Sequence, residues 1–292
     1  QDDDCAAVAA CWTWTALAAT AAQSSSWLSP PTVVATGVTL FTSTDPSLMT
    51  PPGPQSVRLL KLDPSVITLS SAHAGDQILG LETVDVIARR HGAIAAVNAG
   101  FFNTRNGDPA AVMKIAGELV SDATLTRGVV AIGPPQGRAP QTLTFDQLGA
   151  TQSLRYERNG AAVTVPIDGV DTTRARGKLM LYTPMYHGDT DTALNGTEII
   201  LDGQPLAVTE VRVNMGHTPI PRQGAVLSFG GLDLPPAIAG LTPGTRVTIR
   251  TDWRSVHGVP AAVFDGARDI VNGAGLLRRA GAVHDVARAV ED

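Results

Sequence analysis

Cysteine is scarce in this chain, and its position limits what it can do. The two cysteines, Cys5 and Cys11, both lie within the first dozen residues, and the remaining 281 residues contain none. A small secreted scaffold held by disulfides, or a structural zinc site built from thiolates, needs cysteines spread through the fold. The sequence therefore excludes both architectures for everything after residue 11.

Long apolar runs and an excess of positive charge are also missing. No apolar run approaches the roughly 20 residues that a membrane-spanning helix requires. Lysine and arginine total 22 against 27 acidic residues, for a net charge of -5. Proteins that bind nucleic acid usually carry a basic patch or stripe. We therefore predict no transmembrane segment and no nucleic-acid partner.

Familiar cofactor and metal motifs are absent as well. The six histidines show no metal-ligand spacing, no serine lies in a nucleophile elbow, and there is no phosphate-binding loop. Asp189 and Asp191 loosely resemble part of a calcium loop, but the other ligand positions do not match, which favours a solvated turn. The loop 216–221 has a polar tip without an assigned role. The sequence predicts no metal ligands and no evident cofactor.

The first residues resemble a remnant export signal. Residues 6–22 are apolar and rich in small side chains, and residues 19–21 fit an A-x-A cleavage site. Asp2–Asp4 carry the wrong charge for such a signal, so a disordered leader is the alternative. A lipid-anchoring box at residues 8–11 is a weaker interpretation, because the residues after Cys11 are too apolar. We predict that residues 1–28 form a leader outside the core, and that the protein is secreted or lies in the cell envelope.

Turn residues divide the rest of the chain into many short apolar segments. Strand-like runs recur at residues 57–62, 163–167, 208–213 and 225–229, separated by turns such as 159–160 and 202–203. One clear helix is predicted over 83–91, with Gly92 as its stop signal. The pattern predicts an α+β fold, mostly of short antiparallel strands with a few helices.

The segment 93–103 carries the most functional information. An apolar run, 93–97, predicts a buried strand, and it ends in Asn98, Gly100 and the aromatic residues Phe101 and Phe102. An amide at a strand end can donate to and accept from a sugar hydroxyl or a phosphate oxygen. Glycine lets the backbone approach a ligand closely. The alternative is structural: a turn cap, a bulge and two core rings.

This segment resembles the Asn-Gly-Gly-Tyr/Phe-Phe motif of the phosphodiester glycosidase family, with Ala99 in place of one glycine. The following residues, 107–121, resemble the hairpin that comes next in that family, which makes Asp108 a candidate ligand or, equally, a turn residue. Arg127 could neutralise a phosphodiester through two N–H groups, or lie on the surface at a strand start. The resemblance implies substrate-binding roles for Asn98, Gly100, Phe102, Asp108 and Arg127.

A third stretch, 269–281, resembles another part of the same family. In the family it lines the same cleft, so Asn272 and Gly273 are further candidates; a tight hairpin that needs glycine is the alternative. We expect the segment 98–102 to face a cleft that it shares with Asn272 and Gly273.

The family's later motifs, an Arg-Thr-Ala strand and an Asp-Gly-Gly-Gly-Ser loop, have no match here. We therefore expect residues 29–292 to be the N-terminal and central part of a phosphodiester-glycosidase-like domain, with the C-terminal part missing. The resemblance implies a secreted bacterial hydrolase of sugar-1-phosphodiester bonds in glycans. No acid and nucleophile pair stands out, so we expect this chain to be nearly inactive while binding the sugar phosphodiester. The alternative is a non-catalytic glycan-binding or structural β-rich module.

Overall fold

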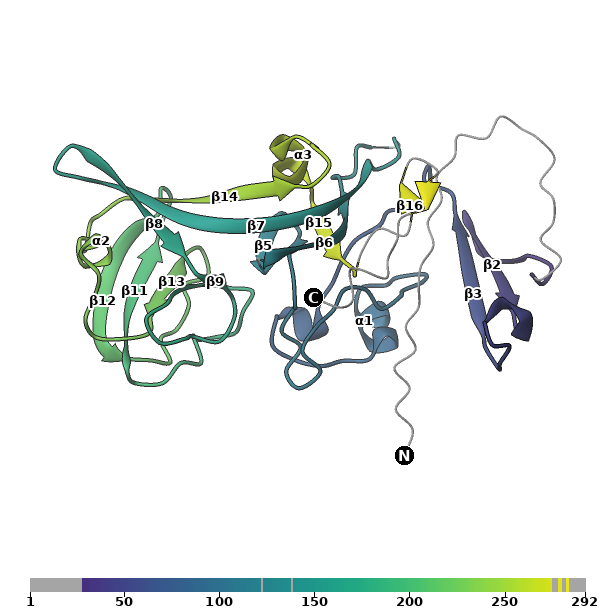
Figure 1. The fold of residues 1–292 in the computed structure, drawn as a ribbon, viewed down its shortest axis with the longest axis horizontal. Coiled ribbons are helices and arrows are strands. Elements are labelled where there is room, and N and C mark those ends of the chain that lie inside the picture. The colour runs from purple at the N-terminus through teal and green to yellow at the C-terminus, as the bar shows by residue number, and fades with distance from the viewer. Residues whose placement is uncertain (1–27, 122, 138, 275–277, 280–281, 284–292) are drawn as a thin grey trace. The chain divides into compact units, whose positions relative to one another are not determined.

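The computed structural model describes residues 28–121, 123–137, 139–274, 278–279 and 282–283 (Figure 1). The predicted leader, 1–28, lies almost wholly outside these residues. The described residues form two compact units. One takes in residues 28–69, 134–142 and 278–283, and the other takes in 70–133 and 143–274.

The smaller unit contains a three-stranded antiparallel sheet and a two-stranded ribbon. Strand β2 lies between β1 and β3, and β3 coincides with the strand-like run predicted at 57–62. The elements are β1 (Thr32–Ala35), β2 (Val38–Ser43), the 3-10 helix η1 (Pro46–Leu48), β3 (Val57–Leu62), β16 (Arg278–Arg279) and β17 (Ala282–Val283).

Seven strands of the larger unit form one sheet. Its order is β14-β7-β6-β15-β4-β5, and β8 also pairs with β7. All its pairings are antiparallel. The strands are β4 (Met113–Ile115), β5 (Glu118–Ser121), β6 (Ala123–Ile132), β7 (Leu143–Arg158), β8 (Ala161–Ile167), β14 (Val247–Ser255) and β15 (Asp269–Asn272).

A second sheet in the same unit has the order β12-β11-β13-β10-β9. Strand β13 is buried along its whole length, as expected for an apolar strand in the middle of a sheet. The pairing of β9 with β10 is parallel, and the other pairings are antiparallel. The strands are β9 (Gly169–Val170), β10 (Leu179–Tyr182), β11 (Gly196–Asp202), β12 (Ala207–Met215) and β13 (Ala225–Phe229).

Strand β7 connects two of the three apolar cores described in this unit. It is 16 residues long and runs as a long curved ribbon beside β14 (Figure 1). Alternate residues of a strand share a face. On one face of β7, Leu148 and Ala150 belong to a core with Phe264 and Ile270. Further along the same face, Leu154 and Tyr156 belong to the core of the five-stranded sheet.

The expected α+β class is wrong, because the fold is predominantly β. Strands make up 42% of the structure and helices 10%. The 3-10 helix η2 (Ala74–Asp76) and α1 (Val84–Arg90), α2 (Pro236–Ala239) and α3 (Ala261–Gly266) are all short. Helix α1 lies where the sequence predicts a helix, but none of its residues is buried. The core therefore comes mainly from the sheets; α2 and α3 add Ile238 and Phe264 to it and form no layer of their own. None of the described helices is long and apolar enough to cross a membrane.

The predicted buried strand over 93–97 is also wrong. These residues join no sheet, and all five are exposed, with Ile94 at 57% and Val97 at 54% of full exposure. Apolar character alone predicts a strand here. A strand also needs neighbours that bond its backbone, and no described strand pairs with this segment.

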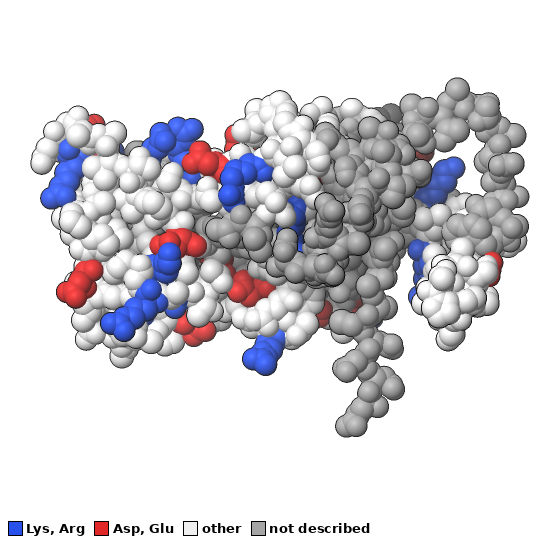
Figure 2. All heavy atoms as spheres, in the orientation of Figure 1, with Lys and Arg blue, Asp and Glu red and all other residues white. Residues whose placement is uncertain are grey.

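Charged side chains are spread thinly over the described surface. Figure 2 shows lysine and arginine side chains interspersed with aspartate and glutamate on the face in view. The mixture agrees with the small net charge of -5.

The buried centre of β13 should dominate the stability of the larger unit. Leu227 is fully buried between β10 and β11. Leu227→Ala should lower the free energy of unfolding by about 2–5 kcal/mol, since it removes apolar contacts and leaves a cavity. Leu232→Ala, at a site that is 51% exposed, is the matched control and should change stability by about 0.5 kcal/mol or less. Urea denaturation followed by circular dichroism measures both; equal effects would contradict the assigned core.

Candidate functional site

The amide of Asn272 connects the end of β15 with two points of the segment 101–112, at least 160 residues earlier in the sequence. Its Oδ1 atom accepts a hydrogen bond from the backbone N–H of Phe101 at 3.1 Å. Its Nδ2 atom donates to the carbonyl oxygens of Ala111, at 3.4 Å, and Val112, at 3.2 Å. Asn272 is the last residue of β15 and is buried. Because the described hydrogen bonds of this amide go to the protein's own backbone, Asn272 positions the loop that contains Phe101.

The neighbouring glycines allow this close approach. Gly100 has a φ of 72°, in the left-handed region that favours glycine. A Cβ atom there would lie 3.3 Å from Oδ1 of Asn272. Gly273 donates its N–H to the carbonyl of Gly128 at 2.7 Å, which extends the pairing between β15 and β6. Gly100 and Phe101 of the segment 98–102 therefore lie against Asn272, and the cleft shared with Asn272 and Gly273 stays a prediction.

Arg127 lies beside this loop and lacks a carboxylate partner. Its guanidinium carbon lies 5.5 Å from the centre of the Phe101 ring, within the range of a cation–π contact. Within the described part of the chain, its Nε atom is buried without a hydrogen-bond partner, and no acidic side chain pairs with it. A half-buried arginine without a counter-ion is suited to bind an anion.

The aromatic residues of the motif are presented to solvent. Phe101 is 50% exposed and Phe102 is 37% exposed, so neither ring is a core residue. Phe102 forms an isolated bridge with Pro109, and the carbonyl of Phe101 accepts a hydrogen bond from the N–H of Ala110. Asn98 is exposed. We name Gly100, Phe101, Arg127 and Asn272, with Gly273, the Asn272 cluster.

Asp108 belongs to a different neighbourhood. Its Oδ2 atom accepts a hydrogen bond from the hydroxyl of Thr172 at 3.0 Å. Burial raises the pKa of the Asp108 carboxyl, and the Thr172 bond opposes this. Asp108 also helps to raise the pKa of the Tyr186 phenol, for which burial is the largest cause and Asp191 the next. The structure thus joins Asp108 to Thr172, and it does not pair Asp108 with Arg127.

A buried carboxylate organises a second group of polar residues. Glu198 in β11 is fully buried and faces the guanidinium of Arg174, whose side chain is only 5% exposed. The carboxylate of Glu198 also accepts hydrogen bonds from three hydroxyls, at 2.6–3.0 Å: those of Thr190, Thr192 and Ser228. A buried charge needs such pairing and hydrogen bonding to be tolerated.

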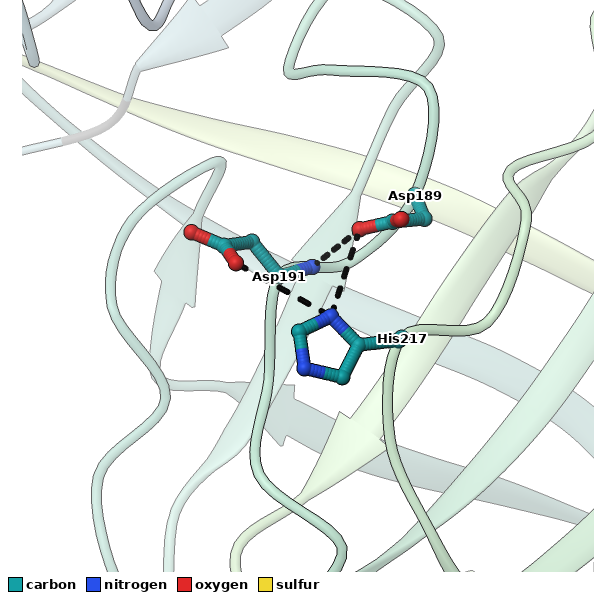
Figure 3. Close-up of side chains that lie close together, drawn as sticks. All are labelled: Asp189, Asp191 and His217. Atoms are coloured by element: carbon teal, nitrogen blue, oxygen red, sulfur yellow. Dashed lines mark hydrogen bonds and ion pairs between the residues drawn. The ribbon is translucent and has the colours of Figure 1, made fainter.

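This network fixes two loops side by side. The hydroxyl of Thr190 accepts a hydrogen bond from the N–H of Thr218 at 3.1 Å, and the N–H of Thr190 donates to the carbonyl of Thr218 at 3.1 Å. Asp189 and Asp191 flank Thr190, and His217 precedes Thr218, so their side chains meet (Figure 3). The sequence indicates a solvated turn around the two aspartates. It does not connect them with His217, which follows 26 residues after Asp191, and no spacing rule could do so.

Comparisons with known proteins identify a fold and no family. No family model matches the chain, and no curated protein matches it. A hypothetical protein from Synechocystis has a similar structure, with a TM-score of 0.67 and 20% identity over 87% of this chain and 45% of that one. A protein of Burkholderia pseudomallei K96243 named "Putative exported protein" has a TM-score of 0.60 and 22% identity, covering 76% of this chain and 50% of that one. The chain spans half or less of these proteins.

The pH dependence of stability tests the environment of Asp108. A pKa raised by folding means that ionisation costs more in the folded state, so the native chain loses stability as pH rises from the unfolded to the folded pKa. Asp108→Asn can still accept the Thr172 bond and does not ionise. Its stability relative to the native chain should therefore increase between acidic and neutral pH.

Urea denaturation across this pH range measures the effect. Asp252→Asn, at an exposed position of β14, is the control for loss of one negative charge. A relative stability of Asp108→Asn that falls as pH rises would mean that the Asp108 carboxylate is stabilised by the fold.

Proposed function

We propose that this chain binds the phosphodiester group of a sugar-1-phosphodiester at the Asn272 cluster. The observation that carries the proposal is Arg127: a half-buried guanidinium with no acidic partner among the described residues, beside a solvent-exposed aromatic loop. A guanidinium matches the paired oxygens of a phosphodiester. The rings of Phe101 and Phe102 offer apolar surfaces to a sugar face.

The resemblance to phosphodiester glycosidases supports the same assignment. The residues that carry it come from three separate stretches, and hydrogen bonds of the Asn272 amide connect all three. In the complete protein we propose hydrolysis of the sugar-1-phosphodiester bond in glycans outside the cytoplasm. The Burkholderia protein is named as an exported protein, which agrees with this location.

Hydrolysis itself is proposed only for the complete protein. Glycoside hydrolysis commonly uses two carboxylates that flank the scissile bond. Asp108 is the one carboxyl among the described candidate residues of the resemblance, and its bonded partner is Thr172. The activity we propose for this chain alone is binding.

The rival function is a structural or non-catalytic glycan-binding β-rich module. One observation favours it: all the described hydrogen bonds of the Asn272 amide go to backbone groups of the protein. This would be the arrangement in a protein whose motif serves only to hold a loop.

Substitution of Arg127 distinguishes these functions. We expect the full chain to bind p-nitrophenyl sugar-1-phosphodiesters, and Arg127→Gln to weaken that binding by about 10- to 150-fold, the equivalent of one charge-assisted hydrogen bond of roughly 1.5–3 kcal/mol. Arg250→Gln, on an exposed position of β14, is the matched control and should leave affinity unchanged. Calorimetric titration measures all three proteins.

Two further ligands distinguish the contribution of the phosphate to the affinity from that of the sugar. The neutral methyl glycoside of the same sugar lacks the anion, and dimethyl phosphate lacks the sugar; both should bind more weakly than the diester. Equal affinity for the diester and the neutral glycoside, or no effect of Arg127→Gln, would refute the phosphodiester function. The first of these results would support the glycan-binding module.

A further inference from the structure

Two loops of the larger unit bring two carboxylates and an imidazole to one point, and none of the three belongs to the proposed function. Asp189 and Asp191 come from the loop before β11, and His217 comes from the loop after β12 (Figure 3). Each contributes one ligand-type atom, and the three atoms lie within 4.8 Å of one another. His217 Nδ1 lies 3.8 Å from Oδ1 of Asp189 and 3.9 Å from Oδ1 of Asp191.

These separations are too long for hydrogen bonds and suit a shared ion. An N–H···O hydrogen bond spans about 2.7–3.2 Å. Two ligands of one ion, each about 2.0–2.2 Å from it, can be up to about 4.4 Å apart. Both distances from His217 meet this limit, and the group as a whole spans up to 4.8 Å, so a bound ion would draw the ligands slightly closer together. The imidazole therefore lies between the two carboxylates without a direct bond to either, as ligands around a common centre do.

A fourth donor lies next to this group. His187 precedes Asp189 by two residues, and its Nδ1 atom lies 4.0 Å from Oδ1 of Asp189. Its side chain is about half exposed, so rotation about its side-chain bonds can turn it toward the same point. Two imidazoles and two carboxylates form a mixed nitrogen and oxygen ligand set. Calcium takes six to eight oxygen ligands, whereas imidazole suits zinc, iron and nickel.

The loops are held in place mainly by buried groups, and Oδ1 of Asp189 also accepts a hydrogen bond from the backbone N–H of Asp191 at 2.8 Å (Figure 3). Glu198 fixes Thr190 and Thr192, and Thr190 in turn bonds Thr218. Outer hydrogen bonds of this kind orient metal ligands. Thr218, next to His217, is buried, and its own hydroxyl has no hydrogen-bond partner in the described part of the chain. A buried polar group without a partner is uncommon, and an ion with its bound water would supply one.

We propose that His187, Asp189, Asp191 and His217 bind a divalent transition-metal ion, with zinc as the probe. The two carboxylates neutralise the charge of the ion. The side chains of Asp191 and His217 are 60% and 58% exposed, so the ion can reach the site from solvent. With all four side chains bound, the tetrahedral shell of zinc would be filled.

The experiment uses the full 292-residue chain with Cys5→Ser and Cys11→Ser, so that thiolates cannot bind the metal. After treatment with a chelator, calorimetric titration with Zn²⁺ should give one saturable site, and Co²⁺ should give visible absorption bands without thiolate charge transfer. Asp191→Asn and His217→Gln should each reduce the affinity for Zn²⁺ by about tenfold or more. Asp252→Asn and His91→Gln are the matched controls and should bind as the parent does.

A second measurement uses the parent chain and therefore does not require that the substituted variants fold. In the parent chain, Zn²⁺ should shift the imidazole NMR signals of His187 and His217 and leave those of His73 and His257 in place. Absence of saturable binding would overturn the proposal. Unchanged affinity in both Asp191→Asn and His217→Gln, or shifts confined to other histidines, would also overturn it, because the metal would then be bound elsewhere.

Discussion

The structure of the larger unit depends on the hydrogen-bonded ladder along β7. This one strand pairs with β6, β8 and β14, and residues on one of its faces belong to two of the three apolar cores. Leu148 of β7 lies opposite Arg127 of β6 in this ladder, and Leu154, further along, belongs to the core of the five-stranded sheet. The Asn272 cluster and the hydrogen-bond network of Glu198 are both held by strands that pair with β7 or pack on the cores to which β7 contributes.

The same physical device positions both polar groups. In each, a buried side chain forms hydrogen bonds with polar groups of neighbouring loops that are not paired within a sheet. Asn272 does so with one amide, at three backbone atoms. Glu198 does so with one carboxylate, through the hydroxyls of Thr190 and Thr192. Charged groups next to these anchors, Arg127 in one case and Asp191 in the other, are thereby held in place without a hydrogen-bonded partner of opposite charge among the described side chains.

The local sequence pattern predicts several of the strands and helices, but it does not predict which distant segments they contact. The strand-like runs at 57–62 and 225–229 predict β3 and β13, and the stop at Gly92 predicts the end of α1. Strand β7 is predicted only over 143–145, because its later residues include glycine, glutamine and serine and form no apolar run. Resemblance selects Asn272, but its bond to Phe101 spans 171 residues, and the meeting of Asp191 with His217 arises from pairing between strands. Such contacts are properties of the topology, which a single sequence does not contain.

The exposed segment 93–102 has a consequence for how this protein behaves in concentrated solution. Ile94, Val97 and Phe101 are each at least half exposed, and these ten residues contain no charge and no proline. Segments of this composition pair readily between molecules. Colloidal stability, rather than resistance to unfolding, should therefore set the concentration at which the chain can be stored. Sulfate and phosphate salts, which strengthen apolar association, should lower that concentration.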